Sequence, residues 1–136
     1  MVPRRDAEKY FPKIIALAGE HRSEFPELFS SWERDHPADT FYVVIDRDLD
    51  DPVGLICCGG IPDYVRPAWW IAYKNQGYGT AAVQLLADEF KRLGVSAIGD
   101  IQIQTVGGQY DTASEKLADY LRRSFAKAQR AKKRQS

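Results

Sequence analysis

The chain has 136 residues, of which 44% are hydrophobic, and its 19 acidic side chains balance 19 lysines and arginines. This length predicts one domain with its own core, and no apolar run approaches the roughly 18 residues of a membrane span. The first six residues also lack the apolar segment of a signal peptide. The sequence therefore argues against both a membrane protein and a secreted one.

The two cysteines, Cys57 and Cys58, are adjacent in the sequence. Neighbouring cysteines rarely bridge, because a strand points successive side chains to opposite faces. Two free thiols in a reducing cytoplasm are expected. The two histidines, His21 and His36, lie far from this pair, so no metal site is predicted.

The balanced charge hides a basic C-terminal end. From Arg122 to Ser136 there are seven basic residues and no acid, so the rest of the chain carries a net charge of −7. Such a run can contact nucleic acid or an acidic partner. It can equally be a solvated helix end, where cations are favourable. We interpret residues 127–136 as a basic tail that follows a single domain of residues 1–126.

Apolar spacing predicts two helices near the start of the chain. The first covers residues 8–18, with Pro12 in its first turn and Gly19 at its end. The second covers residues 24–35. The link from Gly19 to Ser23 either joins the two helices or rims a substrate cleft.

Three strands follow the helices. Residues 41–45 and 53–58 predict a hairpin across an Asp-rich turn. Tyr64 to Tyr73 predicts the next strand, in which Pro67 implies a bulge or a sheet edge. Nothing before Asp6 has the pattern of a strand.

The second half of the chain predicts a helix, a strand and a helix. The first helix covers residues 79–93, and Ala97 to Thr105 alternates as a strand with one polar face. The last helix opens at the capping box Thr112–Glu115. Because the strand Ala97–Thr105 would have an exposed edge, we expect a homodimer.

A loop with two glycines, Gly77 and Gly79, separates the third predicted strand from the helix of residues 79–93. The first N–H groups of a helix have no internal partner, and the helix dipole adds positive potential there. Glycine lets the backbone approach an anion closely. The loop therefore predicts a phosphate site, with a tight strand-to-helix turn as the alternative.

The spacing of Gln76, Gly79 and Ala81 resembles the acyl-CoA signature of the GNAT N-acetyltransferases. A second register starts at Lys74 and places Gly77 and Gly79 at the two small positions. Both registers put the pyrophosphate over residues 74–81. The order of elements is also similar to the centre of the GNAT fold. The resemblance implies an α/β (α+β) class with a mixed, mostly antiparallel sheet and flanking helices, which is acyl-CoA N-acyltransferase-like.

The resemblance implies acetyl-CoA as cosubstrate, no metal, and transfer of the acetyl group to an amine. The implied acetyl-CoA contacts are Ile71, Ala72, Lys74, Asn75, Gln76, Gly77, Tyr78, Gly79 and Thr80, with Asp111 and Ser114 from a second, weaker motif. Backbone N–H groups around Trp70, Ile71 and Ala72 would hold the thioester oxygen. Tyr120 would protonate the leaving thiolate, or else be a half-buried packing residue. Asp63 and Asp100 are candidate bases.

The sequence departs from the family at both ends. The family has a strand before its first helix and two strands after its last, and neither is visible in this sequence, which reads as a minimal version. The missing strands after the last helix favour a second class of function: a non-catalytic acyl-CoA or phosphate-binding regulatory module, dimeric, whose basic tail meets an acidic or nucleic-acid partner. For the enzyme, the acceptor would be a small-molecule or protein amine, and no membrane partner is expected.

Overall fold

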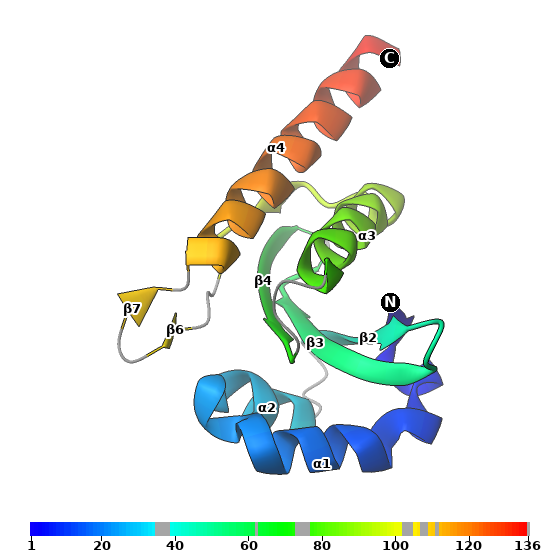
Figure 1. Ribbon diagram of the computed structural model, residues 1–136. Coiled ribbons are helices and arrows are strands. Elements are labelled where there is room, and N and C mark those ends of the chain that lie inside the picture. Colours follow the sequence, from blue (N-terminus) through cyan, green and yellow to red (C-terminus); the bar gives the residue numbers. More distant parts are fainter. Residues whose placement is uncertain are drawn as a thin grey trace.

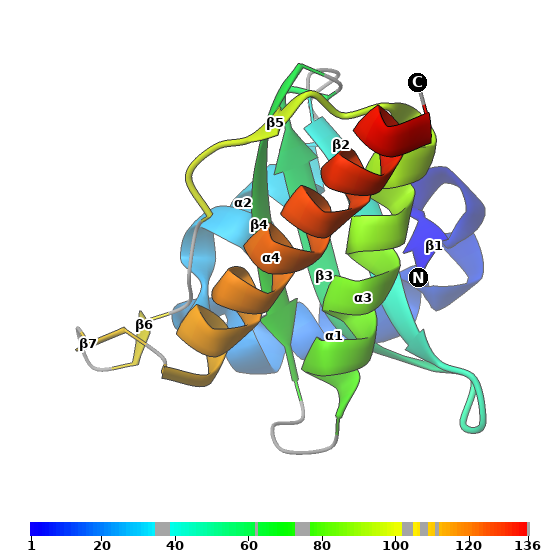
Figure 2. The ribbon, with the colours of Figure 1, turned by 90° about the horizontal axis from the view of Figure 1, so that it is seen from above.

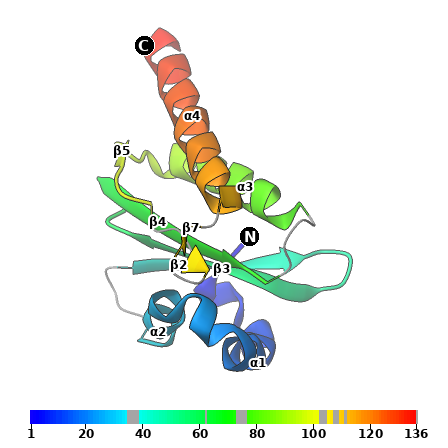
Figure 3. The same cartoon turned by 60° about the vertical axis from the view of Figure 1, so that its left-hand side comes forward.

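The computed structural model has three layers, with a sheet between two pairs of helices (Figures 1 and 3). It describes residues 1–34, 39–61, 63–72, 77–101, 105–106, 109–110 and 112–135. One face of the sheet is covered by α1 (Phe11–His21) and α2 (Pro26–Arg34), and the other by α3 (Tyr78–Leu93) and α4 (Thr112–Gln135). Single 3-10 turns occupy Arg4–Asp6, Glu8–Tyr10 and Arg22–Glu24.

The sheet has five strands in the order β1-β2-β3-β4-β5. Their bounds are β1 Val2–Pro3, β2 Asp39–Asp46, β3 Asp51–Gly59, β4 Tyr64–Ile71 and β5 Ala97–Ile98. Neighbours pair antiparallel up to β4, and β5 pairs parallel with β4. A separate hairpin joins β6 (Thr105–Val106) to β7 (Gln109–Tyr110). The mixed, mostly antiparallel sheet with flanking helices is confirmed.

Each face of the sheet has its own core, because successive strand residues point to opposite faces. Trp69 packs in the core under α3 and α4, whereas Trp70 packs in the core under α1 and α2. The predicted stripes of the second and third helices are buried, with Phe29 and Phe90 each 0% exposed. In α1, by contrast, Ile15 was predicted to belong to the apolar stripe but is 62% exposed, so the prediction is wrong for this residue.

Two expectations for the start of the chain are wrong. A strand does precede the first helix: Val2 and Pro3 pair antiparallel with Val43 and Tyr42. Two residues, one of them proline, are too short for a periodic pattern to show. In addition, α1 does not end at Gly19 but continues to His21.

The predicted strand Ala97–Thr105 is also wrong. Only Ala97 and Ile98 pair with β4, and Thr105 pairs with Tyr110 instead. Residues 102–104 lie outside the described part of the chain. The long exposed edge on which the homodimer was predicted is therefore not formed by this segment.

The chain bends away from β4 at Gly99. The N–H of Gly99 donates to the carbonyl of Val65 at 2.7 Å. A Cβ on Gly99 would stand 2.2 Å from Cε1 of Tyr64, so the missing side chain lets this ring lie directly against the main chain.

The segment that the sequence suggests as a tail continues α4 as helix. α4 reaches Gln135, and its last turns project beyond the body of the molecule (Figures 1 and 3). Arg123, Lys127 and Arg130 are exposed along it. No helix in the described part of the chain is long and apolar enough to cross a membrane.

Candidate active site

The two edges of β4 differ. The N–H of Ala72, just after β4, donates to the carbonyl of Val53 in β3 at 2.8 Å. Because N–H groups alternate sides along a strand, Trp70 also faces β3, while Trp69 and Ile71 face away. Of the three residues predicted to hold the thioester oxygen, only Ile71 therefore points its N–H away from β3. The N–H of Trp69, which was not among the predicted donors, points away from β3 as well.

The start of β4 confirms this alternation independently. The carbonyls of Asp63 and Val65 accept hydrogen bonds from β5, from the N–H groups of Ala97 at 3.1 Å and Gly99 at 2.7 Å. Odd-numbered residues thus face β5. Among the described residues, no strand pairs with this side of β4 beyond Val65.

We call this unpaired stretch the open edge; it consists of the outward backbone of Pro67, Trp69 and Ile71. Pro67 has no N–H and occupies the side on which no described strand needs one. Pro67 was predicted to mark either a bulge or a sheet edge, and the edge is correct. The register shift lies elsewhere, between Val44 and Ile45 of β2.

The N-terminus of α3 has donors without intrahelical acceptors. The first intrahelical bond runs from the N–H of Ala81 to the carbonyl of Gly77, at 3.1 Å. The N–H groups of Gly79 and Thr80 therefore have no acceptor within the helix. The N-cap residue, Gly77, has no side chain with which to cap this end, and the first turn of α3 holds no acid. The dipole and these donors suit an anion such as a pyrophosphate.

The two glycines of this turn serve different purposes. Gly77 has φ of +82°, a left-handed conformation that favours glycine, and a Cβ there would meet nothing within 4 Å. A Cβ on Gly79 would stand 2.8 Å from Cδ1 of Leu117 in α4. Gly77 is thus required by the backbone, whereas Gly79 lets α4 pack closely on α3.

A side-chain contact ties the start of α3 to the sheet. The hydroxyl of Tyr78 donates to Oδ2 of Asp46, at the end of β2. Oδ1 of the same carboxylate accepts from the N–H groups of Asp48 and Leu49, at 2.9 and 3.2 Å. These bonds, that of Tyr78 first, lower the pKa of Asp46. The turn after β2 and the anion-binding end of α3 are therefore held together.

The structure does not bring Tyr120 to the open edge. Tyr120 is half-buried on α4, which lies beside α3 (Figure 2). It lines a groove of about 300 Å³ with Gln84, Ala87, Asp88, Lys91, Ser124 and Lys127. The α3 residues among them come from the middle and end of that helix, away from its first turn, and Ser124 and Lys127 belong to α4. The role predicted for Tyr120 stays a prediction.

Neither candidate base lies near Ile71. Asp63 precedes β4 and is eight residues from Ile71, which is roughly 26 Å along an extended strand. Asp100 follows Gly99, whose N–H is bound to Val65 near the same far end of β4. Both side chains are exposed there.

Several predicted contacts cannot be placed. Lys74, Asn75, Gln76 and Asp111 lie outside the described residues, so the register of the glycine loop stays open. The backbone of Ser114 lies in the first turn of α4, and its side chain is outside the described part. Within that described part, no three His, Cys, Asp or Glu side chains are grouped as a metal site.

The fold and the turn before α3 are those expected of an acyl-CoA N-acyltransferase-like protein. The chain matches the model of the Acetyltransferase (GNAT) family over residues 4–108, which is more than half of its length, and it therefore belongs to that family. Comparison with curated proteins and with solved structures gave no match. Acyl-CoA-dependent acetyl transfer, with acetyl-CoA as cosubstrate, is the general activity of this family. The match includes the open edge and the glycine turn and ends before α4.

Proposed function

We propose that this protein is an N-acetyltransferase that moves the acetyl group of acetyl-CoA to an amine. The observation that carries the proposal is the sequence of features along one stretch of chain. The open edge of β4 leads, through one loop, to the uncapped first turn of α3. Acetyl-CoA has matching parts: a pyrophosphate, an extended arm with two amides, and a thioester.

The pyrophosphate would lie on the N–H groups of Gly79 and Thr80, where the helix dipole is favourable. Lys74 or Gln76 would add side-chain contacts, according to the register. The arm would pair with the open edge as an additional strand does, through its amides. An N–H of Trp69 or Ile71 would then donate to the thioester oxygen and stabilise the charge that develops during attack.

The test is a turnover assay with acetyl-CoA and four kinds of primary amine: an alkylamine, an arylalkylamine, a polyamine and a lysyl peptide. We expect release of CoA thiol that depends on at least one of these amines. A parallel measurement records the melting temperature with CoA, which a ligand of the native state raises in a concentration-dependent way. If no amine causes release of CoA thiol, the proposed acetyltransferase activity is wrong. If the melting temperature does not respond to millimolar CoA, the proposed acyl-CoA binding is wrong.

A second candidate is a non-catalytic acyl-CoA or phosphate-binding regulatory module. The end of α4 favours it, because Arg123, Lys127 and Arg130 are exposed on this helix, whose last turns extend past the body (Figure 1). This function predicts a thermal response to CoA without turnover. It also predicts retention of nucleic acid that falls steeply with salt, as counterion release requires. No retention at about 50 mM salt would remove the nucleic-acid partner.

The homodimer stays a prediction with a different edge. The unpaired side of β4, rather than the segment Ala97–Thr105, is now the edge that a second chain could pair with. Sedimentation checks it: a species of twice 15.4 kDa is expected, and only the 15.4 kDa species at high concentration would contradict it. Because acetyl-CoA would use the same edge, dimers formed there should dissociate when acetyl-CoA is added.

A further inference from the structure

The end of α1 carries a histidine held between a carboxylate and an indole. His21 is the last residue of α1, and its Nδ1 is in hydrogen-bond contact with Oε2 of Glu24. The imidazole lies 5.3 Å from the ring of Trp70, centroid to centroid, with the planes at 47°. Trp70 is only 1% exposed, so it forms a fixed wall. A carboxylate at Nδ1 orients the ring and sets which nitrogen is left to act.

The other ring nitrogen faces a second carboxylate. Oε2 of Glu20 lies 3.7 Å from Nε2 of His21, which is beyond hydrogen-bond length. When Nδ1 donates its proton to Glu24, Nε2 is an acceptor, and the carboxylate of Glu20 is an acceptor as well. An ammonium has three N–H donors, so it can bind both groups at once. The pair is therefore suited to a cationic amine.

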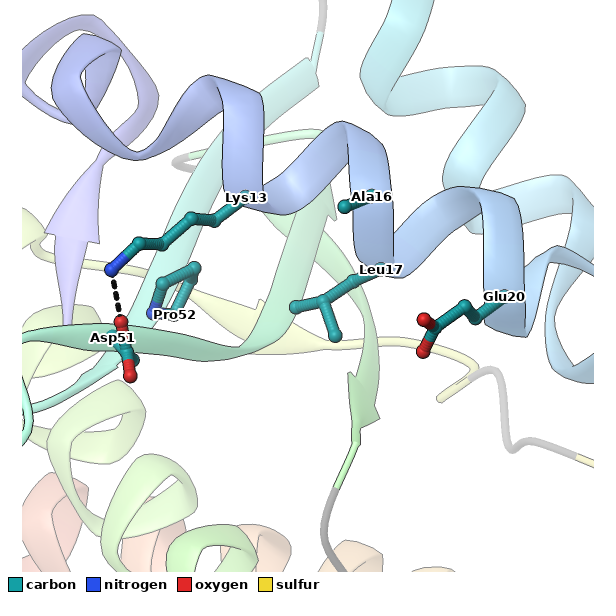
Figure 4. A pocket seen from close by; sticks show the side chains of 6 residues that line it. All are labelled: Lys13, Ala16, Leu17, Glu20, Asp51 and Pro52. Atoms are coloured by element: carbon teal, nitrogen blue, oxygen red, sulfur yellow. Dashed lines mark hydrogen bonds and ion pairs between the residues drawn. The ribbon is translucent and has the colours of Figure 1, made fainter.

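Glu20 also lines a groove between α1 and the start of β3 (Figure 4). The groove holds about 400 Å³ and is lined by Lys13, Ala16, Leu17, Glu20, Asp51 and Pro52. At one end Lys13 is paired with Asp51, while the carboxylate of Glu20 lies at the other end (Figure 4). The groove thus offers apolar walls for a carbon chain and a negative group for an amine.

Trp70 connects this group to the open edge. Its main chain lies between Trp69 and Ile71, whose N–H groups face away from β3. Its side chain lies in the core under α1 and α2, in contact with His21. The groove itself lies on the β3 side of β4, because Pro52 adjoins Val53, which accepts the N–H of Ala72 at the end of β4. His21 therefore stands on the face of β4 opposite α3, at the end where the acetyl group is expected.

We infer that His21 takes the proton of the acceptor amine, with Glu24 as a positioning residue and Glu20 as the group that holds the ammonium. This inference rests on the N-acetyltransferase function proposed above. Nε2 of His21 takes one proton from the ammonium, and the freed electron pair of nitrogen forms a bond to the acetyl carbon. The carbon–sulfur bond breaks and its electron pair leaves on sulfur. The second proton lost from nitrogen goes to the thiolate, and His21 returns its proton to water.

The experiment measures kcat/KM against pH with the best amine of the four-amine panel, for wild type and the variants His21→Gln, Glu24→Gln and Glu20→Gln. His21→Gln should lower kcat/KM by about 10²–10⁴ and remove the acidic limb of the profile, since that limb reports the free enzyme's base. Glu24→Gln should lower kcat/KM about tenfold and keep the acidic limb, because the variant only loosens the hydrogen bond that orients His21. Glu20→Gln should raise KM for the amine more than it lowers kcat.

Two controls separate catalysis from structure. His36→Gln makes the same change at the other histidine and should leave the profile as in wild type. The thermal response to CoA should survive in every variant, which also shows that each one folds. In His21→Ala, added imidazole should restore part of the activity, which a purely structural histidine would not allow.

The outcomes discriminate clearly. If wild type is active and His21→Gln keeps its acidic limb with kcat/KM within about twofold, a range far below general-base effects, the inference fails alone. The same holds if the histidine variants lose stability in step with activity and imidazole restores nothing. If wild type acetylates none of the amines, the proposed function fails and takes this inference with it.

Discussion

The two edges of β4 carry the same kind of backbone groups, but one edge is paired with a neighbouring strand and the other is largely unpaired. Toward β3, every register position from Arg66 to Ile71 is paired, and Ala72 adds a further hydrogen bond to Val53. Toward β5, pairing stops at Val65, and Pro67 removes the next donor from that side. The comparison shows that the direction of a backbone N–H in β4 depends on whether its residue is odd-numbered or even-numbered. A residue's position in a motif does not supply that information.

The sharpest way to test this comparison is proline at adjacent positions, because proline removes one N–H group. Ile71→Pro should fold, since its N–H faces the open edge, and should lower kcat by up to about 10²–10³, the effect of losing one oxyanion donor. Ala72→Pro should instead lose about 1–3 kcal/mol of stability, because the carbonyl of Val53 loses its donor. Steady-state kinetics and urea unfolding measure the two effects.

Ile71→Ala is the control for the lost side chain and should keep most of the activity. The comparison is contradicted if Ile71→Pro and Ala72→Pro behave alike, either both unfolded or both active.

The glycines before α3 give the next largest effect. Gly77→Glu should abolish the thermal response to CoA, because it strains a left-handed position and adds a negative charge beside the phosphates. For wild type that response amounts to about 2.7 kcal/mol when CoA is at a hundred times Kd. Gly79→Ala should keep the response, and its effect on stability should change when Leu117 is replaced by Ala, because the new methyl group meets Leu117.

Melting curves with and without CoA check both variants. An equal CoA response in wild type and Gly77→Glu would show that the loop is a simple turn that does not bind the phosphates. A lost CoA response in Gly79→Ala would show that Gly79 contributes to the phosphate site.

The smallest effect concerns Tyr78 and pH. Because the hydrogen bond from Tyr78 lowers the pKa of Asp46 in the folded state, it adds stability above the ordinary pKa of 3.8, and this stability is lost as pH falls through the folded pKa. Tyr78→Phe should therefore be less stable than wild type at neutral pH, and the difference should shrink in acid. Urea unfolding at several pH values measures it, and a difference that is constant with pH would assign the loss to packing alone.

Much of the fold could be predicted because its elements have clear periods. The stripe that includes Leu86 and Phe90 marked α3, and the Asp-rich turn marked the β2–β3 hairpin. The segment after Gly94 could not be predicted in the same way. Its alternation was that of a strand, but the close approach of Gly99 to Tyr64 and the pairing of Thr105 with Tyr110 are tertiary effects.

The sequence predicted where the loop before α3 lies, but not which backbone N–H groups of β4 point to the open edge. Gly77 and the first turn of α3 were identified correctly as an uncapped helix start. The donor on Trp69 was missed, although Pro67 contained the signal: a proline within a strand faces an edge, so residues two and four positions later face it as well. The contact between His21 and Trp70 joins residues far apart in sequence, and no local pattern predicts it.

Amide hydrogen exchange tests the central claim most directly, because it observes both edges of β4 in one experiment. In the free protein, the N–H groups of Trp70 and Ala72 should exchange slowly, while those of Trp69 and Ile71 exchange fast. Saturating acetyl-CoA should slow Trp69 or Ile71 strongly and leave Trp70 nearly unchanged. Equal protection of all four amides in the free protein, or no change at Trp69 and Ile71 with acetyl-CoA bound, would contradict the account.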